Sequence, residues 1–423
     1  MADVQPLRAL HYDLGKAGPL DRLTAPPYDV IDAQARAELA GRSPYNVVEI
    51  DLPEGENRYE RAAELFEDWK RSGIVVQDEL AIWLLKQTYR MPGGKERVRT
   101  GFFARVRIND YGPGLIRPHE RTHPAAKEDR LRLMRATRAN LSPIFALYPD
   151  PDGTAVSALD AVAERPPWGE VTDAEGTTHR VWRVADPGTI EAVQHALTDR
   201  ELLIADGHHR YETARTYAEE VGGEGGHRYV LMCLVSLSDP GLTILPTHRL
   251  VGGMDGERRA RLEELLARDF RTQSVGFEEL APEGSPNGGL PVYGYLDGAQ
   301  AQPMRLELSS PEPAENALSG HSETYRRLDT AILEKLVLEG ALGMSEDDIS
   351  HERGLGYARD LEAVMAGVLS GEYQVAFLLR ATPVEQVKQV AEAGETMPPK
   401  STYFYPKVLT GLLFNPLSGY DTP

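Results

Sequence analysis

The stretch LIADGHHRYETA, residues 203–214, decides the local fold around the most polar turn of this chain. Its apolar start predicts a short strand, and Gly207 lets the backbone bend where another side chain would clash. After the turn, apolar residues recur at helical spacing, at Tyr211, Ala214, Tyr217, Ala218 and Val221. The sequence therefore predicts a strand that ends in a glycine turn, followed directly by the N-terminus of a helix.

The side chains of this turn suit an anion. His208, His209 and Arg210 follow the glycine directly. A helix N-terminus offers unpaired amide groups and the positive end of the helix dipole, and an arginine adds a forked pair of charge-assisted hydrogen bonds. In the alternative interpretation, Asp206 caps the helix and the histidines are surface residues. The turn is a candidate site for phosphate or carboxylate.

The chain has 423 residues, which is more than one hydrophobic core usually supports. Strand-like and helix-like segments are mixed throughout, and this predicts an α/β fold with α+β character. A linker rich in proline and glycine at residues 149–153 and two glycines at residues 252–253 are the candidate boundaries. We therefore expect three segments, at residues 1–149, 150–253 and 254–423.

Hydrophobic periodicity predicts most of the secondary structure. Strands are expected at residues 46–52, 80–89, 97–108, 143–148, 180–183, 202–205, 229–237, 242–245 and 373–380, with further strands before residue 310. Helices are expected at residues 58–70, 127–138, 190–197, 211–221, 257–268, 324–338 and 356–369. The glycines at residues 93–94 form a hairpin turn and not a Walker loop, because Tyr89 and Glu96 stand where that loop needs glycine and Ser or Thr.

The overall charge limits the class of partner. A formal net charge of −19 argues against sequence-independent binding to nucleic acid or to an anionic membrane, since both attract basic surfaces. No run of eighteen apolar residues is present, and the first residues lack the pattern of a signal peptide. The single cysteine, Cys233, excludes a disulfide within the chain. We expect a cytoplasmic protein with a small-molecule substrate; the sequence leaves the oligomeric state open.

Between residues 117 and 138 the local charge has the opposite sign. Seven basic and three acidic residues give this segment a net charge of +4. Lys127, Arg130 and Arg135 lie on one expected helix and are predicted to converge on an anion if the end of that helix faces the site. The alternative is a solvated basic face.

Residues 119–123 spell HExxH, which on a helix presents two zinc ligands and a glutamate base. Pro124 biases His123 away from helical angles, and Pro118 leaves room for barely one helical turn. We therefore expect a polar loop that presents His119 and Glu120 before the basic helix. A zinc-dependent hydrolase remains the alternative.

Two proline-bounded segments could hold side chains in fixed orientations. Residues 24–31 contain Tyr28 and Asp29, either as a structural turn or as the wall of a site. Residues 397–407 contain Lys400, Ser401 and Thr402 among three aromatic residues. This second loop either places donors on a ligand or plugs the core with its aromatic rings.

Several of these motifs occur together in a known family. APPYDVI (25–31), YNVVEIDLP (45–53), HERT (119–122), KEDRL (127–131), the 206–214 run and MPPKSTYFYPK (397–407) resemble the bacterial and archaeal family called domain of unknown function 1015. The DGHHR motif is also similar to that of the ParB/sulfiredoxin-like fold, where free-serine kinases carry it at the phosphate site. The resemblance implies phosphorylation of L-serine to O-phosphoserine, with magnesium and with a nucleotide or pyrophosphate as donor.

The resemblance also implies roles for single residues. Asp206 would position Mg²⁺ or the acceptor hydroxyl, and His208, His209 and Arg210 would hold the transferred phosphate. The choice of Glu120 as general base is our own inference. A non-catalytic nucleotide-binding or metabolite-binding module of ParB type is a further alternative. The other candidates for contact with substrate or phosphate are Gly207, His119, Thr122, Lys127, Arg130, Arg135, Lys400, Ser401, Thr402, Tyr28 and Asp29.

Overall fold

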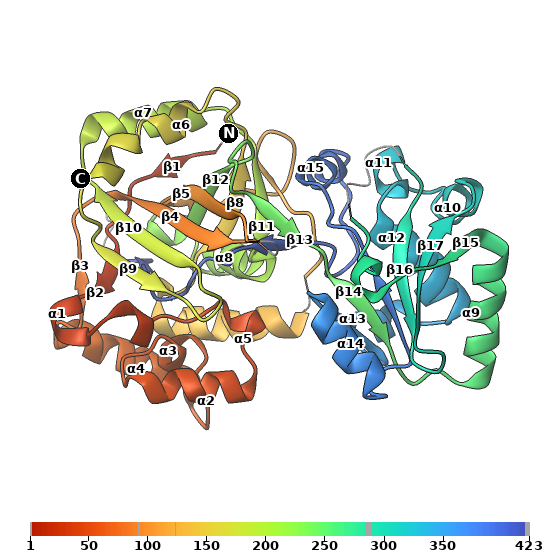
Figure 1. Ribbon diagram of the computed structural model, residues 1–423. Coiled ribbons are helices and arrows are strands. Elements are labelled where there is room, and N and C mark those ends of the chain that lie inside the picture. The colour runs from red at the N-terminus through yellow and green to blue at the C-terminus, as the bar shows by residue number, and fades with distance from the viewer. Residues whose placement is uncertain (1, 92–93, 123, 284–288, 419–423) are drawn as a thin grey trace. The chain divides into compact units, whose positions relative to one another are not determined.

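The computed structural model describes residues 2–91, 94–122, 124–283 and 289–418 (Figure 1). The chain forms two compact units: unit 1 comprises Met1–Pro118, Thr122–Leu242 and Pro406–Pro423, and unit 2 comprises His119–Arg121 and Thr243–Tyr405. Both units contain helices and strands, so the mixed α/β class is confirmed. The three expected segments are not separate units. The linker at residues 149–153 lies inside unit 1, because the strand before it pairs with strands on the far side of the linker.

Unit 1 is built around a nine-stranded sheet in the order β6-β11-β8-β12-β5-β4-β10-β9, with β1 paired to β5. Its strands are β1 (Val4–Gln5), β4 (Ile82–Arg90), β5 (Glu96–Arg107), β6 (Ile116–Arg117), β8 (Ile144–Tyr148), β9 (Gly169–Thr172), β10 (Thr178–Val184), β11 (Leu202–Asp206) and β12 (Tyr229–Ser236). Two short ladders join β2 (Leu10–Tyr12) to β3 (Val75–Gln77) and β7 (Ala139–Asn140) to β21 (Asn415–Pro416). The sheet is mixed, since β12 runs parallel to β8 and antiparallel to β5.

The helices of unit 1 cover this sheet. They are α1 (Leu14–Ala17), α2 (Ala33–Arg42), α3 (Val48–Asp51), α4 (Arg58–Arg71), α5 (Pro124–Thr137), α6 (Thr154–Ser157), α7 (Pro187–Leu197) and α8 (His208–Val221). Tyr211 and Ala214 of α8 enter the same apolar core as Val193 and Leu197 of α7. The helical face predicted after the glycine turn is therefore confirmed from Tyr211 to Ala218, whereas Val221, at the end of α8, is 50% exposed. Helices α2 to α4 enclose a second core around Phe66 and neighbouring residues.

The hairpin of β4 and β5 is confirmed, although residues 92–93 of its turn lie outside the described residues. The strand expected at residues 46–52 is wrong, because α3 forms there instead. Periodicity does not distinguish a strand from a helix in so short an apolar run. The side chain of Asn46 holds the start of this helix. It accepts a hydrogen bond from the amide of Val48 and donates one to the carbonyl of Arg22.

The C-terminal segment returns to unit 1 after the chain has completed unit 2. Thr410 forms a β-bridge with Ala25, and Phe414 forms one with Leu10. The side-chain amide of Asn415 donates a hydrogen bond of 2.8 Å to Asn140. These contacts place residues 406–418 inside unit 1, next to the elements that carry the glycine turn.

Unit 2 contains an antiparallel six-stranded sheet in the order β15-β17-β16-β19-β14-β18. Its strands are β14 (His248–Val251), β15 (Phe270–Ser274), β16 (Val292–Asp297), β17 (Gln302–Leu308), β18 (Leu355–Ala358) and β19 (Val375–Leu378), and a separate ladder pairs β13 (Thr243–Leu245) with β20 (Tyr403–Tyr405). Its helices are α9 (Gly256–Asp269), α10 (Glu312–Ala317), α11 (Glu323–Arg326), α12 (Asp329–Leu333), α13 (Glu346–Ser350), α14 (Leu361–Leu369), α15 (Val384–Glu392) and the π-helix η6 (Glu334–Ala341).

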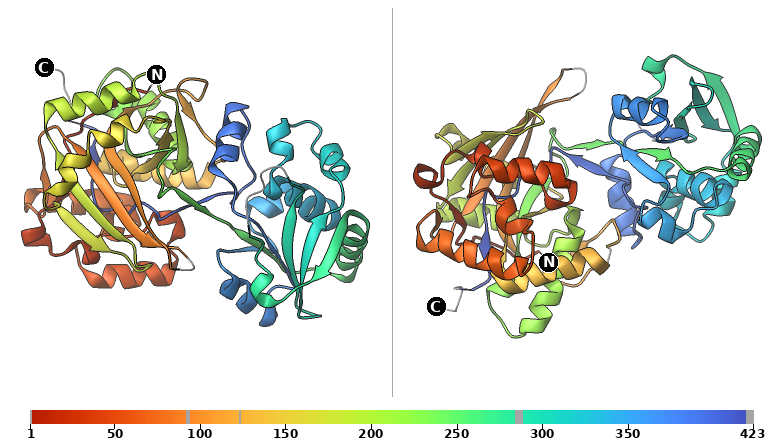
Figure 2. Two further views of the ribbon diagram at one scale, coloured as in Figure 1. Left: turned by 45° about the horizontal axis from the view of Figure 1, so that its top comes forward. Right: turned by 90° about the horizontal axis from the view of Figure 1, so that it is seen from below.

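Helices lie on both faces of the unit 2 sheet, as the further views show (Figure 2). Leu296 of β16 packs with Val364 and Val368 of α14. Tyr293, which points to the other face because side chains alternate along a strand, donates a hydrogen bond of 2.8 Å to the carbonyl of Asp329 in α12. The sheet is thus covered on each side by a different helix.

Every helix within the described ranges is too short or too polar to span a lipid bilayer.

Candidate functional site

The glycine turn forms as expected at the end of β11. Gly207 adopts a left-handed backbone conformation with φ of 94°, and α8 begins at His208. A side chain at position 207 would also clash, because a Cβ there would lie 3.0 Å from the guanidinium group of Arg210. Glycine therefore allows both the turn and the close approach of Arg210. His208 is buried and His209 is half-buried in the first turn of the helix.

Asp206 accepts hydrogen bonds from two cations of unit 1. Its Oδ1 lies 2.5 Å from Nζ of Lys407, and its Oδ2 lies 2.6 Å from Nη2 of Arg210. Burial by itself raises the pKa of Asp206, but the charges of Lys407 and Arg210 outweigh burial and hold the pKa well below its usual range. Asp206 is therefore ionised at neutral pH. We call Asp206, Arg210 and Lys407 the Asp206 cluster.

Arg210 connects this cluster to a neighbouring pocket. Its Nη1 donates to Oγ of Ser142 at 2.9 Å and also to the carbonyl of Pro143. Ser142 in turn lies 2.9 Å from the hydroxyl group of Thr410 in the returning segment. Only 8% of Arg210 is exposed, so these partners fix the direction of a buried guanidinium group.

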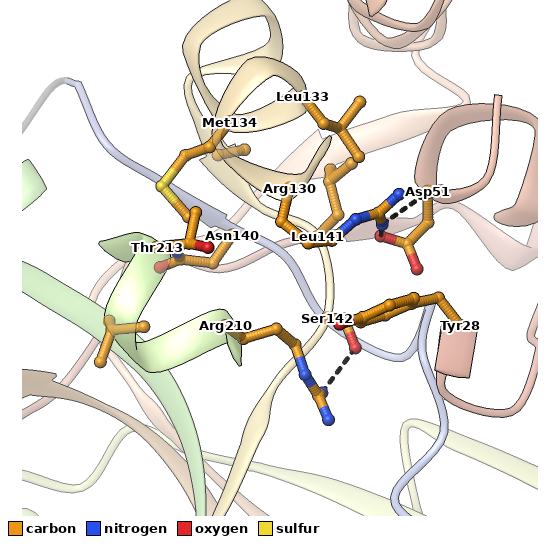
Figure 3. Close-up of a pocket in the computed structure, with 12 residues that line it drawn as sticks. Tyr28, Asp51, Arg130, Leu133, Met134, Asn140, Leu141, Ser142, Arg210 and Thr213 are labelled. Carbon is orange, nitrogen blue, oxygen red and sulfur yellow. Dashed lines mark hydrogen bonds and ion pairs between the residues drawn. The ribbon is translucent and has the colours of Figure 1, made fainter. Parts of the chain in front are cut away.

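The neighbouring pocket, which we call the Tyr28 pocket, has a volume of about 40 Å³ (Figure 3). Figure 3 shows Arg130 entering it from α5 and Arg210 from α8, with Asp51 beside the guanidinium group of Arg130 and the ring of Tyr28 next to both. A pocket of this size has room for about two or three water molecules. It suits a small polar group and excludes a whole nucleotide.

Arg130 and Asp51 form the second charged pair of this pocket. The Nη1 atom of Arg130 donates to the carbonyl of Asp51 at 2.6 Å and lies 3.3 Å from its Oδ1. The guanidinium group stacks 4.4 Å from the ring centre of Tyr28. Burial raises the pKa of Asp51, and the charges of Arg130 and Arg210 offset only part of that effect. Asp51 is thus a buried carboxyl group that binds a proton more readily than Asp206.

The basic residues of α5 do not converge on one point. Nζ of Lys127 pairs with Glu212 of α8 at 2.8 Å. Arg135 pairs with Glu220, two turns further along α8, at 2.6 Å. These cations are spread along the line where α5 packs against α8, and only Arg130 points into the Tyr28 pocket. Asp29 is exposed beside Tyr28.

Another group of expected site residues meets within unit 2. Nε2 of His119 lies 2.8 Å from Oγ1 of Thr402, and Glu120 accepts a hydrogen bond of 3.1 Å from the amide of Lys400. Oγ of Ser401 donates to Thr330 at 3.0 Å. The HERT segment and the 397–407 loop are therefore neighbours, although about 280 residues separate them in the sequence. Thr122 belongs to unit 1 and is half-buried.

Among the residues that the structure describes, the side chains near these sites are not arranged as a set of metal ligands. His119 and Glu120 lie in a loop and a β-bridge, so the helix that an HExxH zinc site needs is not formed there, and His123 lies outside the described residues. Within the described ranges, no three His, Cys, Asp or Glu side chains gather as metal ligands. Both carboxylate oxygens of Asp206 already bind cationic side chains. The chemistry of the Asp206 cluster fits an anion better than a resident Mg²⁺.

Three residues of these sites were not singled out from the sequence. Asp51 lies in the segment interpreted as a strand, Ser142 follows a short ladder, and Lys407 ends the aromatic loop. Lys407 stood in a segment already identified as a possible donor loop, which was the available signal. No feature of the sequence indicated that Lys407 pairs with Asp206.

The chain belongs to the family described as protein of unknown function (DUF1015), whose model matches residues 4–331. No curated protein matches the sequence. Among solved structures, it is similar to a conserved hypothetical protein from Pyrococcus furiosus, with 16% identity, a TM-score of 0.34 and coverage of 68% of this chain and 86% of that one. It is similar to a free serine kinase in complex with AMP, with 14% identity, a TM-score of 0.35 and coverage of 68% and 83%.

A further similar structure is SbnI with a C-terminal truncation from Staphylococcus aureus, with 12% identity, a TM-score of 0.38 and coverage of 74% of this chain and 87% of that one. At these TM-scores the likeness carries no argument about activity. The ParB/sulfiredoxin-like element around the glycine turn stays a prediction.

Proposed function

We propose that this protein is a small-molecule phosphotransferase that phosphorylates free L-serine to O-phosphoserine. The observation that supports it is the charge of the Asp206 cluster, where Arg210 and Lys407 converge on one carboxylate at the N-terminus of α8. Phosphoryl transfer needs oriented reactants and positive charge around the oxygens of the transferred group. The resemblance of the DGHHR motif to that of free-serine kinases supplies the identity of the acceptor.

The balance of charge around Asp206 favours an anionic ligand. Arg99, which is fully buried, is a third cation close enough to interact electrostatically with Asp206. Arg210 also interacts with Asp29 and Asp51, and Arg99 with Asp239. At the cluster itself two cations hold one carboxylate, and a phosphoryl group at the start of α8 would add negative charge beside them.

In this proposal the start of α8 binds the transferred group. The turn at Gly207 presents the first amides of α8, and Arg210 adds its guanidinium group beside them. His208 and His209 are proposed to contact the phosphoryl oxygens. Outside this turn, the proposed ligand contacts in unit 1 are Tyr28, Asp29, Thr122, Lys127 and Arg130, and a separate group of proposed contacts in unit 2 comprises His119, Lys400, Ser401 and Thr402. Arg135 pairs with Glu220 two turns further along α8 and is not among them.

Asp51 is the carboxylate that we propose as general base. Asp206 is held in its ionised form by two cations, which makes it a weak proton acceptor. Burial gives Asp51 a raised pKa, and Asp51 lines the same pocket as Arg210. In the reaction the serine hydroxyl oxygen bonds to phosphorus, the bond to the leaving group of the donor breaks, and the hydroxyl proton passes to Asp51. Glu120, in unit 2, is the alternative base.

The donor is proposed to be a nucleotide or pyrophosphate. The Tyr28 pocket has no room for a nucleotide, so it would receive only the transferred group or the acceptor hydroxyl. Because the Asp206 cluster does not fit a resident Mg²⁺, the ion would enter bound to the donor phosphates.

The experiment incubates the purified full chain with L-serine, Mg²⁺ and either ATP, ADP or pyrophosphate, and measures O-phosphoserine by mass spectrometry. L-Alanine, which lacks the hydroxyl group, is the matched control acceptor. We expect product with at least one donor and none with Arg210→Gln. Absence of product with every donor would exclude the proposed activity, and binding of a donor without turnover would indicate a non-catalytic module.

A further inference from the structure

A row of buried polar side chains crosses three neighbouring strands of the unit 1 sheet and reaches the backbone of Lys407. Arg99 of β5 lies opposite Gln87 of β4, and Gln87 lies opposite His179 of β10. At most 1% of each of these residues is exposed. Because residues opposite one another in a sheet are neighbours, the strand register itself aligns the three side chains.

Both the oxygen and the nitrogen of the Gln87 side-chain amide form hydrogen bonds. Its Oε1 accepts from Nε of Arg99 at 2.9 Å and from Nη2 at 2.5 Å. Its Nε2 lies 3.0 Å from the carbonyl of Lys407 and 3.1 Å from Nδ1 of His179. The last link joins Nε2 of His179 to Oδ2 of Asp173 at 2.9 Å.

These contacts fix where the protons lie. A guanidinium group only donates, so the amide oxygen of Gln87 must face Arg99 and the amide nitrogen must face His179 and Lys407. The amide nitrogen also only donates, so Nδ1 of His179 is the acceptor and the imidazole carries its proton on Nε2, toward Asp173. Burial lowers the pKa of His179, in agreement with this neutral form. Each hydrogen bond in the row therefore has a defined donor and a defined acceptor.

The row ends on two consecutive carbonyl groups of the returning segment. Nη2 of Arg99 donates to the carbonyl of Pro406 at 2.5 Å, and Gln87 holds the carbonyl of Lys407. The side chain of Lys407 then reaches Asp206. Two buried donors thus fix the backbone from which Lys407 extends.

Burying the charge of Arg99 lowers stability, and a purely structural role does not explain that cost. In the part of the chain that the structure describes, it has no carboxylate within 4.0 Å, and its buried Nη1 atom has no hydrogen-bond partner. Burial lowers the pKa of Arg99 to about 10, so the group still carries its charge at neutral pH. A neutral side chain would usually serve stability better than an unpaired buried charge.

We propose that Arg99, Gln87 and His179 are positioning residues that hold the backbone of Lys407 and thereby aim its ammonium group at Asp206 and at a bound phosphoryl group. The inference rests on the proposed function, since it requires the Asp206 cluster to bind a phosphate. It assigns a role to three residues outside the cluster, which reach it through the hydrogen bond from Gln87 to the backbone carbonyl of Lys407.

Gln87→Glu tests the proposal without removing the partner of Arg99. The new carboxylate still accepts from Arg99, and this salt bridge offsets part of the stability lost with the other two contacts. It has no donor for the carbonyl of Lys407 or for His179. We expect a folded variant with a melting temperature close to that of the wild type and pyrophosphate binding weakened about tenfold or more, as expected when a charged contact is misplaced by a fraction of an ångström. Gln77→Glu, on the exposed part of β3, controls for the added charge.

A neutral pair of variants separates positioning from electrostatic repulsion. His179→Asn keeps an acceptor oxygen near the place of Nδ1 and should bind pyrophosphate like the wild type. His179→Phe removes the acceptor and should bind more weakly. Binding is measured by titration calorimetry on the full chain, with Lys407→Met in parallel. Wild-type affinity in both Gln87→Glu and His179→Phe, together with loss in Lys407→Met, would overturn the positioning role and leave the proposed function standing. Wild-type affinity in Lys407→Met itself would contradict the proposed anion site.

Discussion

Nζ of Lys407 lies 2.5 Å from Oδ1 of Asp206, although 201 residues separate them in the sequence. The intervening chain includes all of unit 2 except His119–Arg121. Their ion pair therefore depends on the return of the C-terminal segment to unit 1, and it connects the folding of that segment to the charge of the glycine turn.

Lys407→Met should destabilise unit 1 and change its response to acid. The paired Asp206 has a pKa below its unfolded value, so it stabilises the protein above about pH 4 and this contribution is lost as the pH falls further. Removing one partner of a buried pair costs about 3 kcal/mol. Denaturant unfolding at pH 7 and pH 3 should show a larger loss at pH 7. Lys16→Met, at an exposed pair, should cost less than about 1 kcal/mol.

Local sequence patterns predicted the turn and the helix of the site but not which charged side chains pair there. The turn at Gly207 and the face of α8 were predictable because a glycine bend and helical spacing are properties of neighbouring residues. The pairing of Asp206 with Lys407 was not, since nothing in either segment specifies a partner so distant in sequence. Loop composition also does not give the division between the units: β8 pairs with β11 and β12 across the linker at residues 149–153, and unit 2 begins at Thr243, ahead of the glycines at residues 252–253.

The short helix α3 shows a second limit of prediction from sequence. Its apolar residues fit a strand as well as a helix, and the contact of Asn46 with Arg22, which holds the start of α3, joins segments that a local pattern does not relate. Asp51, at the end of α3, reaches Arg130 only because this segment is a helix. A wrong secondary-structure assignment therefore hid a candidate catalytic carboxylate.

Gly207→Ala should weaken phosphate binding more than its backbone strain alone would explain. Alanine in the left-handed region costs about 1 to 2 kcal/mol, and its Cβ would push the guanidinium group of Arg210 away from Asp206. Gly222→Ala, at the other end of α8, adds similar strain at φ of 70° and meets no atom within 4 Å. Thermal unfolding should show similar losses in both variants, and calorimetry should show weaker pyrophosphate binding in Gly207→Ala only. Equal binding in the two variants would show that Arg210 tolerates displacement.

Asp51→Asn should abolish the proton-accepting step while leaving the substrate bound. In the serine assay we expect kcat to fall about 10²-fold to 10⁴-fold, with KM changed much less. The wild-type rate should fall as the pH drops through the raised pKa of Asp51, because the base must be ionised, and the variant should lack this dependence. Glu120→Gln is the matched variant for the alternative base. A larger loss of kcat in Glu120→Gln than in Asp51→Asn would transfer the role to Glu120.

Glu334, the first residue of the π-helix in unit 2, should make that unit less stable as the pH rises. Burial raises the pKa of Glu334 to about 7, with Arg249 offsetting part of the effect. In the unfolded chain a glutamic acid loses its proton near pH 4.3, so between that pH and about pH 7 the folded state holds more protons and stability falls with increasing pH. The shift corresponds to about 4 kcal/mol, which partial exposure reduces to about 2 kcal/mol.

Glu334→Gln should remove this slope, because glutamine does not titrate. The measurement is the melting temperature of the full chain from pH 5 to pH 8 for the wild type, for Glu334→Gln and for Glu323→Gln, whose side chain is 70% exposed. We expect the wild type and Glu323→Gln to lose stability in parallel across this range and Glu334→Gln to lose less. Parallel curves for all three proteins would mean that Glu334 titrates like an ordinary surface glutamate, and that its burial beside Arg249 does not favour the protonated form.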